Sequence, residues 1–330
     1  MLWKPVDVLT TVFAGLLFVA GLARFQALEE RGVLLRMIVV AVIPALIATL
    51  RGRKPNPSKP LQVFLDYYVI ACVLVIFDGL GPLIRAVNPV DRDTALVAFD
   101  RWLFGTDPTV ALERFATPLL TDVLTVFYAL YYFHPIVLGT LVFLDDRARP
   151  AASSDFPRYA FVMVFVFYVS YACYFLVPAI GPRYTVAHAG PLPRGAIAQA
   201  IDHTLDVLEK NKRDCFPSGH TMVLTAILFE ANRRSRKTFW VFLPFAVGLF
   251  VATVYCRYHY VADVIAGFAL AFAAVPLGNA LYRRFATSRY RREIRPPKTS
   301  RGFRMSRLSS SIHENSAHLW PMRIPSFAAS

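Results

Sequence analysis

Two short stretches place histidines where hydrophobic segments begin, and their residues suit phosphoryl transfer. The stretch "RDCFPSGHT" (213–221) contains His220, and "CRYHYVADVIAG" (256–267) contains His259 and Asp263. Because His259 and Asp263 are four residues apart, a helix carries them on one face. A carboxylate that accepts a hydrogen bond from one imidazole nitrogen raises the basicity of the other, which can then attack phosphorus. We therefore predict His259 as the nucleophile, Asp263 as its orienting acid and His220 as the general acid and base.

A phosphate that reacts at these histidines needs donors for its oxygens, and four residues are candidates. Ser218 and Gly219 stand at the start of a predicted helix, where free N–H groups and the helix dipole attract anions. Arg183, in "VPAIGPRYT", and Arg257 are cationic donors on the same side of the predicted bundle. The structural alternative is that Ser218 is only an N-cap and that the arginines only keep loops soluble.

Further polar residues are candidates for contacts with a lipid headgroup or for lining a pocket. His134 and Asp78 lie inside predicted spans, where ionisable groups are costly and often functional. Packing against a partner near a Pro or Gly kink is the alternative for both. Tyr184 and Tyr258 are the aromatic neighbours of the two candidate arginines.

The elements that must position these residues are membrane helices. Of 330 residues, 56% are hydrophobic and 18% are charged, which is too apolar for a soluble chain of this size. Since a span needs about 20 apolar residues, charge-poor runs predict about eight transmembrane helices, near 6–23, 33–50, 61–84, 119–144, 157–178, 218–231, 238–256 and 260–282. These runs are too continuously apolar for barrel strands. The predicted fold class is all-α, a polytopic membrane helix bundle.

The predicted spans divide the chain into three parts. Residues 1–60 form two N-terminal transmembrane helices, and residues 61–282 form a six-helix catalytic core. Within the core, residues 91–116 mix apolar side chains with charges and predict interfacial helices. Residues 283–330 predict a basic, disordered cytoplasmic tail.

The distribution of positive charge predicts the orientation in the membrane. The formal net charge is +14, and residues 283–307 hold ten Arg or Lys against the single acid Glu293. Loops at 51–60, 145–156 and 232–237 are also short and basic. Because such loops stay on the cytoplasmic side, both termini are predicted to be cytoplasmic and the active site extracytoplasmic.

The motifs together resemble a known family. "FPSGHT" and "HYVADVIAG", with "GPRYT" ahead of them, are similar to elements of the type 2 phosphatidic acid phosphatase superfamily of membrane lipid phosphatases and phosphotransferases. The resemblance covers the six spans from about 61 to 282, and it implies a six-helix core, a phosphohistidine intermediate and no metal or other cofactor. By motif matching, it implies a nucleophile at His259, its orienting acid at Asp263, an acid and base at His220, and phosphate contacts at Ser218 and Gly219.

Two departures from the phosphatase pattern resemble the inositol phosphorylceramide synthase branch. The lysine of the Lys-x6-Arg-Pro element is missing ahead of Arg183, and Thr253 stands where the phosphatases carry an arginine, six residues before His259. With "FDRWLFGTDPT" and "YCRYHYVADV", they imply transfer of a phosphoalcohol, such as phosphoinositol, between lipids. The acceptor, a lipid hydroxyl or water, stays open, and a simple lipid phosphate or pyrophosphate phosphatase is the alternative.

Two remoter functions use the same residues. Two histidines and a carboxylate can hold iron or zinc, as in a metal-dependent hydrolase. A cluster that only grips a headgroup phosphate would suit a lipid flippase, although no internal repeat is visible. Membrane lipids are the predicted substrate and one of the two alternatives for the acceptor, and no feature predicts nucleic-acid binding. A disulfide between Cys215 and Cys256, which fall beside the motifs, is an open alternative.

Overall fold

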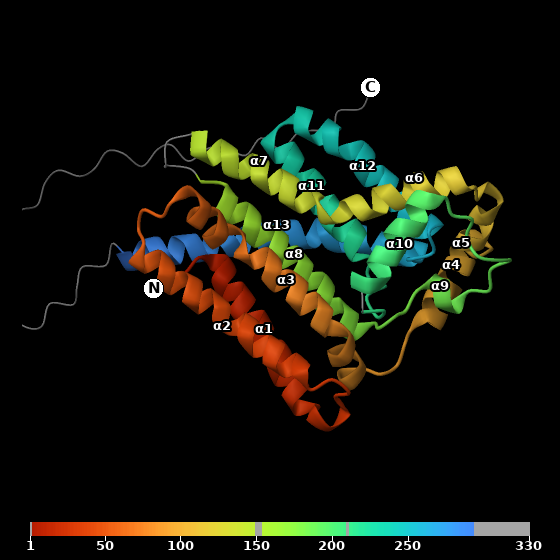
Figure 1. The fold of residues 1–330 in the computed structure, drawn as a ribbon, viewed down its shortest axis with the longest axis horizontal. Coiled ribbons are helices and arrows are strands. Elements are labelled where there is room, and N and C mark those ends of the chain that lie inside the picture. Colours follow the sequence, from red (N-terminus) through yellow and green to blue (C-terminus); the bar gives the residue numbers. More distant parts are fainter. Residues whose placement is uncertain (1, 149–153, 209–210, 294–330) are drawn as a thin grey trace, which may run out of the picture. The chain divides into compact units, whose positions relative to one another are not determined.

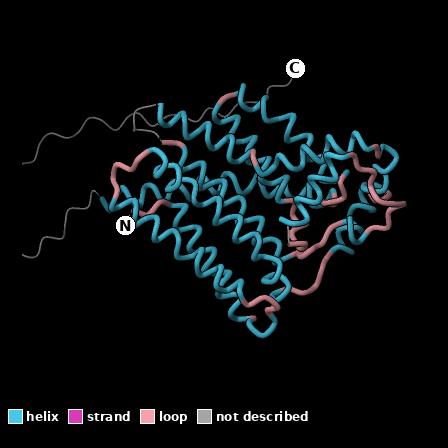
Figure 2. The backbone as a smooth tube through the Cα atoms, viewed as in Figure 1, coloured by secondary structure: helices cyan, strands magenta, loops and turns pink. Residues whose placement is uncertain are grey.

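The protein is helical throughout the part of the chain that the computed structural model describes, residues 2–148, 154–208 and 211–293. Thirteen α-helices and three 3-10 helices follow one another, and the described residues contain no strand (Figure 1, Figure 2). The predicted all-α class is therefore confirmed. Residues up to Arg289 form one compact unit, and the predicted tail beyond residue 293 lies outside the described residues.

Six helices are long and apolar enough to cross a membrane. They are α1 (Pro5–Ala23), α2 (Gly32–Arg53), α3 (Lys59–Val87), α8 (Phe156–Leu176), α12 (Arg236–Tyr255) and the Val261–Ala286 part of α13 (Val261–Glu293). A bent pair makes a seventh span when it is counted as one; it consists of α6 (Pro118–Ala129) with η3 (Leu130–Tyr132), and α7 (His134–Ala148). These helices identify a multi-pass membrane protein.

These helices and the bent pair account for seven of the eight predicted spans, and the run at 218–231 forms a shorter helix. This helix, α11 (Gly219–Arg234), has 16 residues. It packs against α7, α8 and α12, and most of its side chains are buried. Its apolar side chains therefore pack mainly against the other helices of the bundle.

The bend between α6 and α7 follows from a proline. The two helices meet at 47°, and Pro135 is the second residue of α7. Proline lacks an N–H group, and its ring disfavours helical backbone at the preceding residue. The imidazole of His134 occupies this break, where Nδ1 donates a hydrogen bond of 2.6 Å to the Leu130 carbonyl oxygen.

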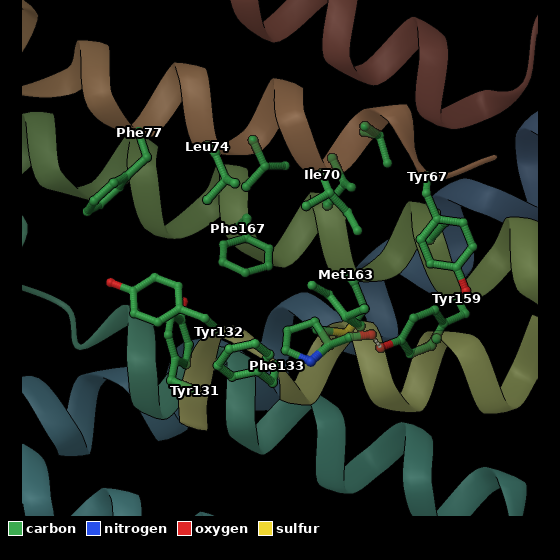
Figure 3. Close-up of a pocket in the computed structure, with 18 of the residues that line it drawn as sticks. Tyr67, Ile70, Leu74, Phe77, Tyr131, Tyr132, Phe133, Tyr159, Met163 and Phe167 are labelled. Carbon is green, nitrogen blue, oxygen red and sulfur yellow. Dashed lines mark hydrogen bonds between the residues drawn. The ribbon is translucent and has the colours of Figure 1, made fainter. Parts of the chain in front are cut away.

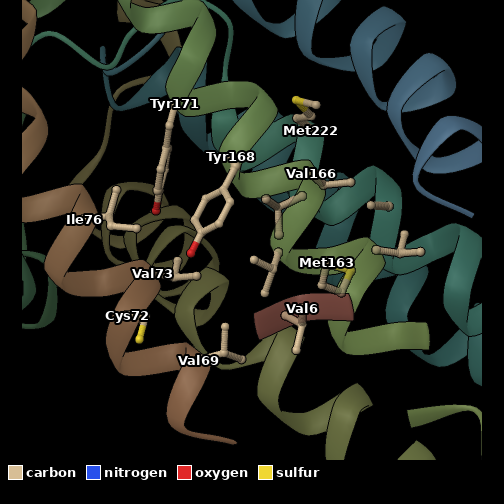
Figure 4. Packing of buried hydrophobic residues seen from close by; sticks show 14 of the residues in the cluster. Val6, Val69, Cys72, Val73, Ile76, Met163, Val166, Tyr168, Tyr171 and Met222 are labelled. Atoms are coloured by element: carbon tan, nitrogen blue, oxygen red, sulfur yellow. The ribbon is translucent and has the colours of Figure 1, made fainter. Parts of the chain in front are cut away.

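The largest cluster of buried apolar side chains packs α3 against α8, with α1 and α11 at its edges. In Figure 4, Val73 and Ile76 of α3 lie near Tyr168 of α8, and Met222 of α11 lies beyond Val166. All five side chains are buried. Because α8 contacts α1 and α3 as well as α11, it holds the N-terminal helices against the helices that carry the motifs.

A buried ion pair fixes α11 between α8 and α13. Arg158 Nη1 donates to Glu230 Oε1 at 2.9 Å and to Asn279 Oδ1 at 2.8 Å. A charge as buried as that of Glu230, which is 3% exposed, needs such a partner. Helices α11 and α13 are thus held side by side, and both begin at the same end of the bundle, which we call the site end.

The remaining helices are short. They are η1 (Phe25–Ala27), α4 (Asp93–Phe104), α5 (Pro108–Ala111), η2 (Leu112–Phe115), α9 (Pro182–Thr185) and α10 (Ala196–Leu208). Figure 1 shows α4, α5, α9 and α10 gathered at one end of the bundle. The segment predicted to be interfacial, 91–116, supplies α4, α5 and η2, and Trp102 of α4 is 77% exposed. Its place at the membrane surface stays a prediction.

Candidate active site

The two motifs meet where α11 and α13 begin. The backbone nitrogen of Ser218 donates to the carbonyl oxygen of Asp263 at 3.0 Å. Gly267, one turn further along α13, permits this approach, because a Cβ there would lie 2.7 Å from the Ser218 carbonyl oxygen. The first turns of the two helices are therefore in direct contact, and His220 and His259 come together.

The two histidines face each other through defined nitrogens. His220 Nδ1 lies 3.2 Å from His259 Nε2. On the other side of its ring, His259 Nδ1 lies 2.9 Å from the carbonyl oxygen of Cys215 and 3.4 Å from Asp263 Oδ2. A carbonyl oxygen can only accept, so Nδ1 carries the hydrogen. The lone pair of the neutral His259 ring is therefore on Nε2, the nitrogen that faces His220.

The carboxylate of Asp263 is held in place from several sides. Its Oδ2 accepts hydrogen bonds from the Tyr260 backbone nitrogen at 2.9 Å and from Cys215 Sγ at 2.8 Å, besides its contact with His259. Burial, and then the nearby Asp263 charge, raise the pKa of the Cys215 thiol well above its usual range. The thiol therefore stays protonated and serves as a donor to the carboxylate, which fixes the orientation of the carboxylate beside His259.

Two tyrosines that the sequence analysis missed enclose His220. The ring centroids of Tyr128 and Tyr131 lie 4.5 Å and 4.3 Å from that of His220. They come from α6 and η3, and their spacing of three residues puts them on one helix face, which is the signal that could have identified them. His220 Nε2 is buried and has no hydrogen-bond partner among the described residues. The ring is thus clamped by its faces, with one nitrogen left for a ligand.

A cavity of about 60 Å³ brings most of the predicted site residues together. We call it the histidine cavity; its lining includes His220, His259, Arg183, Tyr184, Arg257 and Tyr258. The guanidinium carbon of Arg183 lies 4.3 Å from the centroid of the Tyr258 ring. The backbone nitrogen of Arg183 donates to the carbonyl oxygen of Arg257 at 3.0 Å. Helix α9 therefore places one cationic side chain directly beside the histidine pair.

Arg257 is tied into the loops around the cavity. Its backbone has a positive φ of 64°, and its guanidinium donates to the Gly190 carbonyl oxygen at 2.8 Å and to Glu113 Oε1 at 3.0 Å. Because both terminal nitrogens of the Arg257 guanidinium already have a hydrogen-bond partner, this side chain has fewer donors left for a phosphate. A role in holding the loop of η2 over the cavity fits these contacts directly.

Besides Asp263, four predicted residues lie outside the lining of the histidine cavity. Ser218 is fully buried, and its side chain caps α11 by accepting from the Thr221 backbone nitrogen at 3.2 Å. Gly219 is next to it and packs against Tyr174. His134 lies against the rings of Phe242 and Phe245. Asp78 pairs with Arg36 in a separate polar chamber described below.

Two aspartates of α4, also missed, fasten the site loops. Asp100 accepts hydrogen bonds from the backbone nitrogens of Val261 at 2.9 Å and Ala262 at 2.8 Å, in the first turn of α13. Asp93 accepts from the Gly181 nitrogen at 2.8 Å and from the Tyr260 hydroxyl at 2.9 Å. The two aspartates are seven residues apart and so share a helix face. That spacing is the signal in the sequence.

A group of potential metal ligands exists, but it differs from the two-histidine set considered above. Ligand atoms of Cys215, His259 and Asp263 lie within 4.8 Å of one another, and all three residues are buried. To hold an ion, the group would have to give up the bond from the thiol to the carboxylate and the bond from the imidazole to the Cys215 carbonyl oxygen. Cys215 and Cys256 are both free thiols, so the structure contains no disulfide between them.

Comparison with known proteins gives one match. Neither the curated proteins nor the solved structures contain a chain that matches this one. The family model described as the PAP2 superfamily matches residues 94–277, more than half of the chain, and that range includes both histidines, Asp263 and Arg183. The chain therefore belongs to the PAP2 superfamily.

Proposed function

We propose that the protein is a membrane lipid phosphotransferase or phosphatase that works through a phosphohistidine on His259. Membership of the superfamily supports an enzyme of the phosphatase type. One observation carries the finer proposal. The lone pair of His259 Nε2 points at His220 Nδ1 across 3.2 Å in a buried cavity, with Asp263 behind the nucleophile and Arg183 beside it.

The proposed reaction has two halves that use the histidines in turn. His259 Nε2 attacks phosphorus while His220 gives its proton to the departing lipid alcohol oxygen, and Arg183 stabilises the charge on the equatorial oxygens. His220 then removes a proton from the acceptor hydroxyl, whose oxygen attacks phosphorus and releases His259. A gap of 3.2 Å cannot hold phosphorus between the two nitrogens, so the His220 ring has to turn aside between its tyrosines to admit the phosphate.

The polar chamber favours transfer of a phosphoalcohol over simple hydrolysis. This chamber, of about 610 Å³, adjoins the histidine cavity, and the two share Tyr184, Asn211 and Lys212. Asn211 is buried, and its Nδ2 has no hydrogen-bond partner among the described residues. The arginines that line the polar chamber pair with acids, as Arg213 does with Asp91 at 2.7 Å. Such a chamber suits an uncharged polar group, so we propose that a headgroup of the phosphoinositol type occupies it.

The orientation is proposed from charge. Basic loops at the end of the bundle opposite the site end support cytoplasmic termini, a cytoplasmic tail and an extracytoplasmic active site. The division into two N-terminal helices and a core from residue 61 is part of the same proposal. An impermeant thiol reagent added to intact cells should then reach the variant Ala189→Cys and miss Lys54→Cys, both at exposed positions.

The phosphohistidine is tested by trapping. Purified protein mixed with a radiolabelled lipid phosphate and quenched in base should carry a label that acid removes, and His259→Ala should carry none. His203→Ala, at an exposed position, is the matched control and should trap normally. Retained labelling of His259→Ala would overturn the assignment.

The remoter alternatives separate in the same assay. A chelator should leave turnover unchanged and vanadate should inhibit it, whereas a metal-dependent hydrolase would lose activity in chelator. If the protein were a lipid flippase, the variant His220→Ala would still move lipid across vesicle membranes.

A further inference from the structure

An apolar groove runs from His220 toward the opposite end of the bundle. It lies between α3, α7 and α8 and has a volume of about 230 Å³. His220 and Gly219 line it at the site end, and Tyr67 and Tyr159 line its far end. His220 also lines the histidine cavity. The groove and the cavity therefore meet at the side chain proposed to protonate the leaving group.

The walls of the groove are two helix faces in register. Figure 3 shows Phe77, Leu74, Ile70 and Tyr67 in sequence along α3, with Phe167, Met163 and Tyr159 of α8 across from them. Both series step by three or four residues, which keeps one face of each helix on the groove. A molecule in the groove would therefore meet these pairs in order as it extends away from His220.

The groove is longer than one leaflet of a bilayer. Along α8 its lining extends from Phe156 to Tyr174, a distance of about 27 Å at a rise of about 1.5 Å per residue. The hydrocarbon core of both leaflets together is about 30 Å thick. The groove therefore extends over most of the thickness of the hydrocarbon core.

The groove is open to lipid along its side and closed at its far end. Leu74 and Phe133 line it and are nevertheless 51% and 59% exposed. At the far end the rings of Tyr67 and Phe156 lie 5.1 Å apart. The Tyr159 hydroxyl donates to the Pro135 carbonyl oxygen at 2.6 Å, which anchors that ring across the end.

We propose that this groove binds one hydrocarbon chain of the lipid substrate, that it accommodates a chain longer than one leaflet, and that Tyr67 and Tyr159 limit the length. The proposal rests on the proposed function, since the phosphate at His259 and the alcohol oxygen at His220 direct the attached chain into the groove. The substrate class is thus a phosphate ester of a long-chain alkyl or isoprenoid alcohol, whose chain packs against the apolar walls of the groove.

Photocrosslinking maps the chain without any turnover. The probes are octyl, hexadecyl and tetracosyl phosphate, each with a diazirine at the terminal carbon, added to the full-length protein in detergent. The octyl probe should label near Leu74 and Phe167, the hexadecyl probe near Ile70 and Met163, and the tetracosyl probe near Tyr67 and Tyr159. Labels that scatter over the exposed faces of α1 and α2, or that do not move with chain length, would overturn the proposal.

Blocking the groove tests its use by the enzyme. Ala160→Trp fills the groove beside Tyr159 and should lower the ratio of kcat/KM for tetracosyl phosphate to that for octyl phosphate by roughly ten- to hundredfold. Ile70→Trp, on the opposite wall, should do the same. Ala172→Trp makes the same change at an exposed position of α8 and should leave the ratio unaltered. Equal ratios in all three variants would contradict the proposal.

The two proposals can fail separately. If His259→Ala still trapped label or turned over substrate, the proposed phosphohistidine at His259 would be wrong, but the crosslink positions would still support chain binding in the groove. If the trapped label behaved as expected but the probes ignored the groove, the mechanism would stand without this substrate class.

Discussion

The backbone nitrogen of Ser218 and the carbonyl oxygen of Asp263 are joined by a hydrogen bond of 3.0 Å, so the two motifs are connected main chain to main chain. The separation of His220 and His259 is therefore set by the crossing of α11 and α13 and not only by side-chain conformation. This relationship explains why a serine without access to the histidine cavity belongs to the motif: it caps α11 and holds α13 at the correct distance.

A side chain at Gly267 should push α11 and α13 apart where they cross. In Gly267→Ala the new Cβ would lie 2.7 Å from the Ser218 carbonyl oxygen, which is backbone and cannot move without shifting α11. We expect a loss of about 1–3 kcal/mol in stability and a large fall in kcat, measured by thermal unfolding in detergent and by lipid phosphate turnover. Gly15→Ala, whose Cβ would meet nothing within 4 Å, is the control. Equal behaviour of the two variants would show that the crossing is not tight.

Loss of His220 should depend on the leaving group. General acid catalysis contributes roughly 10²–10⁴-fold, so His220→Ala should slow release of an alkyl alcohol by about that factor. Release of p-nitrophenol, which leaves without a proton, should slow far less. Rapid-quench measurement of product from hexadecyl phosphate and from p-nitrophenyl phosphate checks this, with His203→Ala as the control. A uniform loss on both substrates would assign His220 to binding instead.

The thiols near the site should resist alkylation in the native protein. Burial raises the pKa of Cys256 to about 12 and that of Cys215 well above its usual range. The thiolate, which is the reactive form, is then about one part in ten thousand at pH 8 for Cys256. We expect iodoacetamide to leave both residues unmodified until the protein is denatured, when all four cysteines should react without reductant. If two cysteines of the denatured protein reacted only after a reductant was added, they would form a disulfide. The variant Ala189→Cys, with a thiol at an exposed position, is the control and should react in the native protein.

The local part of the fold and of the site could be predicted from the sequence. Apolar runs give helices, and a spacing of four residues puts His259 and Asp263 on one helix face whatever surrounds them. The surroundings of α11 could not be predicted, because a run of apolar residues has the same pattern whether it faces lipid or the other helices of a bundle. With 16 residues, α11 is the shortest of the predicted spans, and most of its side chains are buried.

The contacts between distant segments could not be predicted in this way. Tyr128 and Tyr131 reach His220 across about 90 residues of chain, and Asp100 reaches α13 across about 160. No periodicity within a segment indicates which helix it will face. Arg257 shows the same limit, because its predicted role came from its charge, while Glu113 and the Gly190 carbonyl oxygen decide where the guanidinium points.

Asp100 offers the sharpest test of a residue that only the structure reveals. Its two carboxylate oxygens accept from the backbone nitrogens of Val261 and Ala262, whose N–H groups have no partner within α13 because they belong to its first turn. In Asp100→Asn one oxygen becomes an NH2 group that faces a backbone N–H, so one buried donor loses its acceptor. That loss should cost about 1–3 kcal/mol and should lower kcat, since the same turn carries Asp263.

The measurements are thermal unfolding in detergent and turnover of a lipid phosphate, with Asp107→Asn as the matched control. Asp107 lies just after the end of α4 and pairs with the exposed guanidinium of Arg101 at 2.9 Å, and a surface pair adds little to stability. If Asp100→Asn unfolded and turned over like Asp107→Asn, α4 would be a cover over the site and not the part that fixes the start of α13.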